Sequence, residues 1–364
     1  MAQHLVYSFL ISWHIIIIMA QIPLELYRPI VETITDQNTL LSLLLASRHL
    51  SMEAERILYH TIERDDPDLE SQKLFFRTVI DCPRVARLVW RYHLFSMLLI
   101  VDDDPYWTLF PAALRALVNL KELEFKNFRE VPTVHVLRGC TFQLVSLIWE
   151  CYDDENDLSV FLAGQEVLER LCVDYWGGEC AGPPTSALQN LSFLNGSSHA
   201  IRTFLPGRTI TRLRWYPYYG DPVLDVASIS SALRNLHVLA LDGPDTLLSL
   251  STIVDYLPNL RFLELVDDQE MDLLSIQRLP RLEGLVISSP IPSEQCQNLV
   301  IRLYSETKSL LFIDIYVNSS DIPDGYQRWY RDSTEPVQVT STRSNSTWQG
   351  DFLSHFDSGL LLAG

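Results

Sequence analysis

Two acidic runs contain the residues best suited to metal chemistry. Residues 102–104 and 153–157 offer carboxylate oxygens, the ligands that calcium prefers. The second run begins like a calcium loop, but Leu158 stands at its sixth position, where glycine makes the sharp turn, and Gly164 stands at its twelfth, where glutamate is needed. We therefore expect no metal and no cofactor, and we interpret both runs as solvated loops.

The sequence contains no recognisable catalytic motif. There is no P-loop, GxGxxG, HExxH or nucleophile elbow, and the nine histidines are dispersed. The six cysteines form no CxxC pair, which indicates reduced thiols in a cytoplasmic or nuclear protein. A net charge of -18 repels phosphate backbones, so nucleic acid is not an expected partner. We expect a binding protein and not an enzyme.

An apolar phrase, LxxLxL, recurs from Cys82 onward. Neighbouring copies mostly lie 22 to 28 residues apart, with two longer intervals of 35 and 42, and their central residues are Leu88, Leu123, Leu147, Leu171, Leu213, Leu239, Leu263, Leu285 and Ile313. That period is typical of leucine-rich repeats, in which stacked strand units share one core. The asparagine that usually follows the phrase is absent, so each repeat is expected to use its own loop chemistry, with longer loops in the two long intervals.

Strand alternation predicts which residues line the face opposite the leucines. If the leucines point inward, their neighbours lie on the exposed face of the sheet. There we expect a group of arginines that could bind a carboxylate or phosphate. Beyond it we expect an apolar stretch of Val238, Phe262, Val266, Val286, Phe312 and Tyr316. The predicted substrate-binding residues are Arg170, Arg212, Arg214, Tyr216, Phe262 and Phe312. Pairing of the arginines with Glu150 and Asp174 is the simpler alternative.

Residues 19–62 predict three short helices. Tyr27, Ile30, Val31 and Ile34 form an apolar stripe, and the polar residues 36–39 supply an N-cap before the apolar run 40–45. Ser51 is expected to cap the third helix, and a linker helix is expected within residues 63–81. These helices hold more Leu and Ile than they can bury among themselves. Either a partner helix covers the surplus, or the surplus packs against the first repeat.

The two ends of the sequence differ from the rest. Residues 1–18 are almost wholly apolar, and we favour translation from Met19 over a signal peptide or membrane anchor. Residues 321–364 are predicted to be a Ser/Thr-rich flexible tail, of which residues 352–362 could dock on the last repeat. The predicted repeat domain therefore covers residues 82–320.

The N-terminal segment resembles an F-box. The resemblance rests on residues 22–26 (IPLEL), followed by Ile30, Ile34, Leu40, Leu41, Leu44 and the Ser47-Arg48 pair. With repeats behind it, the chain resembles the F-box/leucine-rich-repeat class, which implies an α/β fold made of a short three-helix F-box and an irregular repeat solenoid. In that class the F-box docks on the Skp adaptor, and through it on cullin, while the repeats hold a protein substrate. The resemblance implies that the adaptor-binding residues are Pro23, Leu24, Ile30, Leu40, Leu41 and Leu44.

The expected function is therefore a substrate receptor of a cullin–RING ubiquitin ligase. The alternative is a secreted or membrane-tethered repeat protein that binds an extracellular ligand. A membrane is an expected partner only if residues 1–18 are retained, and a glycosylated Asn190 would favour that alternative.

Overall fold

Two compact units make up the chain. The first comprises Met1–Phe128 and Val134–Leu144, and the second comprises Arg129–Thr133 and Val145–Gly364. The computed structural model describes residues 23–64, 69–94, 104–127, 134–151, 155–173, 182–217, 221, 224–242, 249–266, 273–288, 291, 293–319, 322–331, 333 and 335–339. The predicted leader (1–18) and the last part of the predicted tail (340–364) lie outside these residues.

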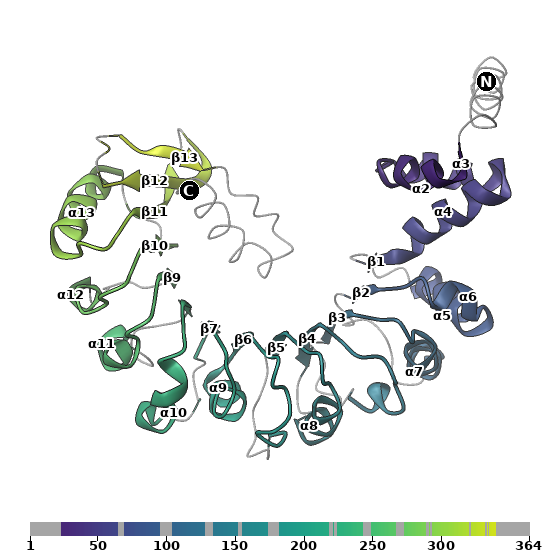
Figure 1. Cartoon of the computed structure of the whole chain (residues 1–364), viewed down its shortest axis with the longest axis horizontal. Coiled ribbons are helices and arrows are strands. Elements are labelled where there is room, and N and C mark those ends of the chain that lie inside the picture. The colour runs from purple at the N-terminus through teal and green to yellow at the C-terminus, as the bar shows by residue number, and fades with distance from the viewer. Residues whose placement is uncertain are drawn as a thin grey trace. The chain divides into compact units, whose positions relative to one another are not determined.

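Three short helices open the first unit, and the third leads directly into a strand (Figure 1). They are α2 (Leu24–Glu32), α3 (Gln37–Ala46) and α4 (Arg48–His60). The Asp36 carboxylate accepts a hydrogen bond from the Thr39 backbone N–H at 2.7 Å, which confirms the predicted cap of α3. The predicted cap of the next helix is wrong, because Ser47 and not Ser51 accepts the Leu50 N–H, at 3.3 Å. Local polar residues thus separate α2, α3 and α4.

Parallel strands and helices alternate in the rest of the first unit. The strands β1 (Thr61–Arg64), β2 (Arg91–Leu94) and β3 (Glu122–Asn127) pair in chain order. Between and after them lie α5 (Leu69–Asp81), α6 (Pro83–Ala86), α7 (Tyr106–Ala116) and η1 (Val134–Leu137). The ladder therefore begins at Thr61, ahead of the predicted boundary at Cys82, and the predicted linker helix α5 lies between two paired strands.

In the first strands, one predicted central residue is wrong. Leu88 lies in a turn, and Tyr92 takes the register position beside Leu123. Tyr92 is buried, as is Leu94, because the alternation of residues 91–94 points both toward the helices. The corrected interval, from Tyr92 to Leu123, is 31 residues, so the misplaced first copy accounts for only part of the 35-residue interval.

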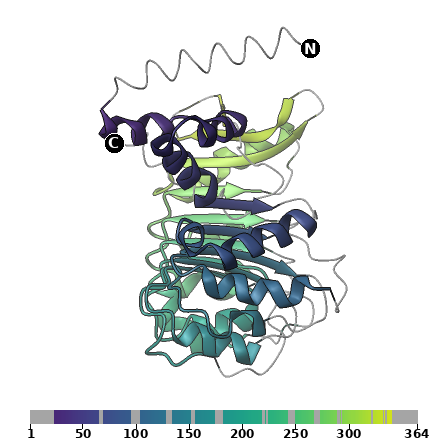
Figure 2. The ribbon, with the colours of Figure 1, turned by 90° about the vertical axis from the view of Figure 1, so that its right-hand side faces the viewer.

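The second unit repeats the strand-and-helix pattern in chain order. Its parallel strands are β4 (Ser146–Cys151), β5 (Arg170–Val173), β6 (Phe193–Gly196), β7 (Arg212–Trp215), β8 (Val238–Asp242), β9 (Phe262–Val266), β10 (Gly284–Ile287) and β11 (Phe312–Ser319). The intervening helices are α8 (Glu155–Ala163), α9 (Ser198–Phe204), α10 (Val226–Leu233), α11 (Leu250–Ile253), η2 (Val254–Tyr256), α12 (Leu273–Ile276) and α13 (Ser293–Glu306). These helices lie on one face of the sheet, and the strand arrows point the same way (Figures 1 and 2). We call the other face, which has no helix among the described residues, the open face.

Leucines form the core between the strands and the helices. Leu147, Leu171, Leu194, Leu213, Leu239, Leu263, Leu285 and Ile313 are adjacent register partners and are fully buried. All but Leu194 were predicted, and the apolar phrase does mark the inward edge of each strand.

The 42-residue interval contains a strand and a helix, and not the long loop that was predicted. Leu191 precedes strand β6 and Leu194 lies in it, but Gly196 replaces the third apolar residue of the phrase. A Cβ at Gly196 would lie 2.6 Å from the Ala200 Cβ and 3.1 Å from the Val173 carbonyl oxygen. Close packing of α9 therefore requires the glycine that hid this repeat from the pattern.

Asparagines join successive repeats, although not at the position that was sought. Asn119, Asn190 and Asn259 each stand just before the phrase, and each donates a hydrogen bond of 2.8 Å to a carbonyl of the preceding repeat. In the next copy Arg281 replaces the asparagine and donates to the Asn259 side-chain oxygen at 3.0 Å. The prediction that each repeat uses its own loop chemistry is therefore wrong for these repeats.

An antiparallel hairpin follows the last parallel strand. Strands β12 (Ile322–Tyr330) and β13 (Val337–Val339) extend the sheet beside β11. Both lie in the predicted flexible tail, so that prediction is wrong for residues 322–339. The hairpin is fixed by Arg328, whose guanidinium donates to both Asp314 carboxylate oxygens at 2.8 and 2.7 Å.

Candidate protein-binding sites

Helix α3 exposes much of its apolar surface. It carries five leucines within residues 40–45, interrupted only by Ser42. Only Leu40 and Leu43 are fully buried, while Leu41 is 47% and Leu45 91% exposed. Residues four apart lie on the same side of a helix, so Leu41 and Leu45 form one row. The apolar side of a helix is ordinarily covered by other elements, and this row is not.

A small apolar core between α2, α3 and α4 holds α3 in place. Val31, Leu40, Leu43, Leu50 and Ala54 pack together and are buried. The core is small, yet it fixes the α3 backbone and leaves the Leu41/Leu45 row facing away from it. The row therefore lies on a preformed surface.

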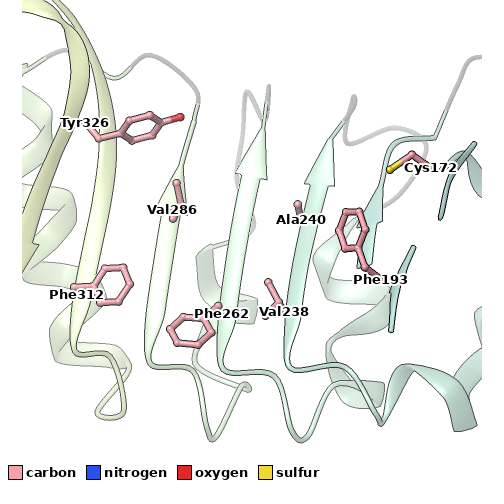
Figure 3. Close-up of a cluster of buried hydrophobic side chains, with 8 residues drawn as sticks. All are labelled: Cys172, Phe193, Val238, Ala240, Phe262, Val286, Phe312 and Tyr326. Carbon is pink, nitrogen blue, oxygen red and sulfur yellow. The ribbon is translucent and has the colours of Figure 1, made fainter. Parts of the chain in front are cut away.

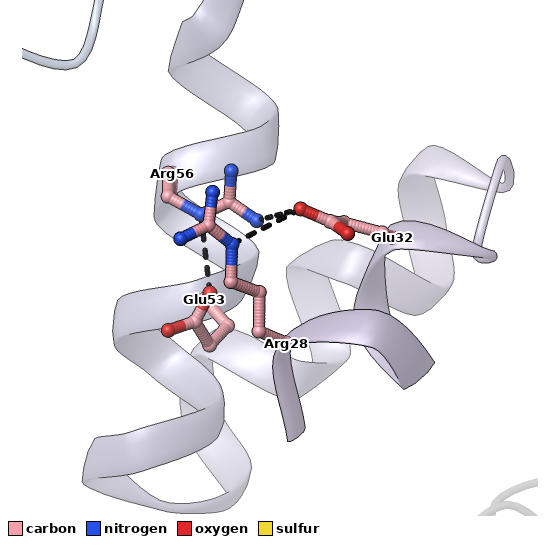
Figure 4. A network of polar contacts seen from close by, with 4 residues as sticks. All are labelled: Arg28, Glu32, Glu53 and Arg56. Atoms are coloured by element: carbon pink, nitrogen blue, oxygen red, sulfur yellow. Dashed lines mark hydrogen bonds and ion pairs between the residues drawn. The ribbon is translucent and has the colours of Figure 1, made fainter. Parts of the chain in front are cut away.

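Charged side chains link α2 to α4 beside this core (Figure 4). Arg56 donates to Glu32 at 2.6 Å and to Glu53 at 3.1 Å, and Arg28 donates to Glu32 at 3.2 Å. The hydrogen bond from Arg56, supported by the one from Arg28, lowers the pKa of Glu32. Exposed pairs of this kind add little individually, so the network orients α2 and α4 more than it stabilises them.

The structure separates the predicted adaptor-binding residues into different environments. Pro23 and Leu41 are exposed, Ile30 and Leu44 are half-buried, and Leu40 is in the core. The side chain of Leu24 lies outside the described residues. Leu40 therefore supports the surface from below and is not part of it.

Two exposed leucines were missed. Leu45 follows Leu41 by one helical turn, a spacing that could have identified it. Leu26, which is 48% exposed, lies on α2. The alternative that the surplus leucines pack against the first repeat is wrong for Leu41 and Leu45, because both side chains are exposed.

The open face of the second unit carries the predicted substrate-binding residues. Cys172, Phe193, Val238, Ala240, Phe262, Val286, Phe312 and Tyr326 gather there in one cluster, with Ile148 and Tyr316 against it (Figure 3). Five residues of the predicted apolar stretch therefore lie in or against one cluster, whereas Val266 is buried but is not part of it. These residues are not exposed as predicted, because Val238 is only 9% exposed and Phe262 and Phe312 are each 5% exposed. We conclude that this cluster, which also buries the predicted Val286, is a second core and not an open docking surface.

A missing side chain brings two phenylalanines of this cluster together. Gly284 lies between Phe262 and Phe312 on adjacent strands, and the two ring centroids are 6.3 Å apart. A Cβ at Gly284 would approach the Phe312 ring to 2.5 Å and the Phe262 ring to 2.8 Å. The rings therefore occupy the space that the glycine leaves.

Two of the predicted anion-binding residues already have partners. Arg214 is buried and donates to the Asp242 carboxylate at 2.7 Å, and its pKa is raised because nearby Glu264 and Asp242 outweigh the effect of burial. The Tyr216 hydroxyl donates to the Val173 carbonyl oxygen at 3.1 Å. Both side chains form contacts between strands, so neither fits the predicted role of binding a carboxylate or phosphate. Of the arginines in the simpler alternative, only Arg214 has a carboxylate partner among the described residues, and that partner is Asp242 and not Glu150. The predicted partner Asp174 lies outside the described residues.

Arg170 and Arg212 stay partly exposed on either side of a residue that the sequence analysis missed. Phe193 is the register partner of both, and the Arg170 guanidinium lies 5.6 Å from the centre of its ring. Asn195 follows on the same face, with its side-chain oxygen buried and unbonded. Both were missed because strand β6 itself was not recognised.

Neither a metal site nor a membrane-spanning helix is found in the part of the chain that the structure describes. No group of three or more His, Cys, Asp or Glu side chains is placed there to hold a metal ion. None of the described helices combines the length and apolar character needed to cross a bilayer. The sequence matches no protein-family model, and a search of curated proteins finds no match. The local geometry is therefore the basis for the functional proposal.

Proposed function

We propose that the protein is a substrate receptor of a cullin–RING ubiquitin ligase, in which α2–α4 act as an F-box that docks on the Skp adaptor. The strand-and-helix repeats, in this proposal an irregular leucine-rich-repeat solenoid, hold a protein substrate. The receptor has no catalytic residues of its own, and it raises the reaction rate by keeping the substrate near the ubiquitin that other subunits transfer.

The observation that carries the proposal is the exposed leucine row on α3. Leu41 and Leu45 lie on a helix that the protein covers on one side only. Burying a leucine side chain contributes about 1.5–3 kcal/mol, so a partner that covers both gains a substantial part of the free energy of a micromolar complex, about 8 kcal/mol. An amphipathic partner helix laid along α3 would bury the row.

The decisive experiment is a pull-down of the full chain with purified Skp adaptor. Leu41→Asp/Leu45→Asp should weaken adaptor binding at least about tenfold, since the variant loses the burial of two apolar side chains and places two charges in the interface. The matched control is Leu74→Asp/Val118→Asp, which places the same two charges at exposed apolar positions elsewhere in the same unit. These two side chains are 64% and 45% exposed. The control variant should bind like the wild type.

Two outcomes contradict the proposal. The first is a wild-type chain that retains no adaptor. The second is an equal loss of binding in the α3 variant and the control variant, which would indicate a general effect of surface charge and not an interface on α3.

A further inference from the structure

Arg170, Phe193 and Arg212 begin three adjacent strands. They are register partners on β5, β6 and β7, and the next residue of each strand, Leu171, Leu194 or Leu213, is fully buried in the leucine core. Strand alternation therefore places the two arginines and Phe193 on the open face. Phe193 belongs to the cluster on that face (Figure 3). We call Arg170 and Arg212 the arginine pair.

The arginine pair differs from the other strand arginines of the second unit. Among the described strands β4–β13, Arg214 pairs with Asp242 and Arg328 pairs with Asp314, both at 2.7 Å. No carboxylate of the described residues pairs with Arg170, whose guanidinium only contacts the Phe193 ring. Within the same residues, the Arg212 guanidinium makes no hydrogen bond or ion pair. Two of the four strand arginines are therefore left with unneutralised charge.

Arg170 also has an unmet hydrogen-bonding requirement. Its Nε is buried and has no hydrogen-bond partner. A buried donor on a charged group is costly to leave unbonded, and native structures rarely leave such donors unsatisfied. The nearby Phe193 ring fixes the guanidinium but provides no acceptor oxygen. The buried Nε is closed to solvent, so an incoming ligand would be bound by the outer nitrogens of the guanidinium.

Charge and spacing indicate the ligand. Adjacent strands lie about 4.8 Å apart, so the backbones of Arg170 and Arg212, which are two strands apart, lie roughly 10 Å from each other. The protein as a whole carries a net charge of -18, so two unpaired cations on one face are distinctive. Guanidinium forks match the geometry of carboxylates and phosphates.

We propose that the arginine pair binds oxyanions on a segment of another protein, either side-chain carboxylates or a phosphorylated residue. The inference rests on the proposed receptor function and names the chemistry of the captured substrate. Phe193 is a positioning residue, because it holds the Arg170 guanidinium between the strands. Arg214, Tyr216, Phe262 and Phe312 hold the sheet together and take no direct part.

Titration of the full chain with three labelled peptides tests the proposal. The peptides are an octaglutamate, a Ser/Gly peptide with one phosphoserine, and the same Ser/Gly peptide without phosphate. The wild type should bind at least one anionic peptide and not the neutral one. Binding of octaglutamate identifies carboxylates as sufficient, whereas binding of the phosphopeptide alone identifies phosphate. Raising the salt from about 50 to about 300 mM should weaken the binding.

Variants assign the binding to the arginine pair. Arg212→Gln should weaken peptide binding at least about tenfold, since a charge-assisted hydrogen bond is lost. It should leave the fold intact, because Arg212 has no hydrogen bond, ion pair or ring contact to lose among the described residues. Arg170→Gln should weaken binding to a similar extent. The matched control is Arg302→Gln on α13, which removes the same charge from a residue that is already paired with Glu306 at 3.1 Å. The control should bind within about twofold of the wild type.

Three results overturn the proposal. They are no binding of either anionic peptide up to on the order of 1 mM, equal weakening in Arg302→Gln, and tighter binding of a single-stranded oligonucleotide than of either peptide. The adaptor pull-down does not depend on these titrations. A failed pull-down with intact peptide binding refutes the receptor function, and the reverse refutes only the role of the arginine pair.

Discussion

Replacing Asp314 by asparagine tests the buried pair that fixes the C-terminal hairpin. The Asp314 side chain is fully buried and that of Arg328 is 4% exposed, and two hydrogen bonds of 2.7 and 2.8 Å join them. The Arg328 guanidinium also lies 4.5 Å from the centre of the Phe312 ring. The hydrogen bonds from Arg328 to Asp314 raise the pKa of Arg328. A guanidinium is effectively always protonated in a protein, so Arg328 stays a cation when its partner is removed.

The size of the effect follows from what is left behind. Asp314→Asn leaves a buried cation without its counter-charge, and breaking such a pair costs about 3–5 kcal/mol. Domains are stable by only about 5–15 kcal/mol, so the loss is a large share. Replacing both partners, as in Asp314→Leu/Arg328→Met, should be close to neutral, because a buried ion pair and an apolar pair of similar volume have comparable net stability.

Urea denaturation followed by circular dichroism measures both variants. With a slope of about 1–3 kcal/mol per molar urea, the single variant should unfold at a midpoint roughly 1–5 M lower than the wild type, and the double variant should recover most of that difference. A single variant that loses less than about 1 kcal/mol would contradict the buried pair. So would a double variant as unstable as the single one.

Three further outcomes follow from other contacts. Gly284→Ala should lower the free energy of unfolding by about 1–3 kcal/mol, because its Cβ would meet two phenyl rings. The control Gly164→Ala, whose Cβ would lie 3.5 Å from the Phe161 carbonyl oxygen, should change that free energy by less than about 1 kcal/mol. Urea midpoints compare the two variants, and equal midpoints would refute the packing argument. Arg56 lowers the pKa of Glu32 below 4.5, and the Thr39 hydroxyl and N–H lower the pKa of Asp36 below 3.8. At a pH above their unfolded pKa values, both carboxylates therefore stabilise α2–α4, and this stability is lost as the pH falls through the folded pKa values. Glu32→Gln/Asp36→Asn should flatten the decline of the urea midpoint between about pH 5 and about pH 3, and an unchanged decline would assign it to other carboxyls. Asn259→Ala should cost about 1 kcal/mol by removing the bond to the Arg234 carbonyl oxygen, whereas Asn235→Ala, one repeat earlier, serves as a control because no side-chain bond of Asn235 is found among the described residues.

Local sequence patterns predicted most of the strands and missed a few. Leu123 and Leu239 are recognisable because an apolar triplet returns at a steady period. Strand β6 escaped because Gly196 replaces the last apolar residue, a choice that depends on the packing of Ala200. The hairpin β12–β13 escaped because the polar sequence beyond residue 331 resembles a tail, while its stability comes from Asp314, which lies in another strand.

For the candidate sites, the sequence predicted the correct face but not its accessibility. Alternation placed Phe262 and Arg214 on the open face correctly, because side chains on a strand point to opposite sides in turn. Whether such a side chain is buried depends on contacts between repeats. Arg214 has its partner 28 residues away in Asp242, and nothing in the local sequence identifies that pairing. The α3 row was predictable in kind, since Leu41 and Leu45 are one turn apart.

Hydrogen exchange of the full chain, with and without purified Skp adaptor, tests the central claim most directly. If α3 carries the docking surface, the adaptor should slow amide exchange in residues 37–46 and leave strands β8–β10 unchanged. Unchanged exchange in α3 under saturating adaptor, or protection confined to the second unit, would contradict the account.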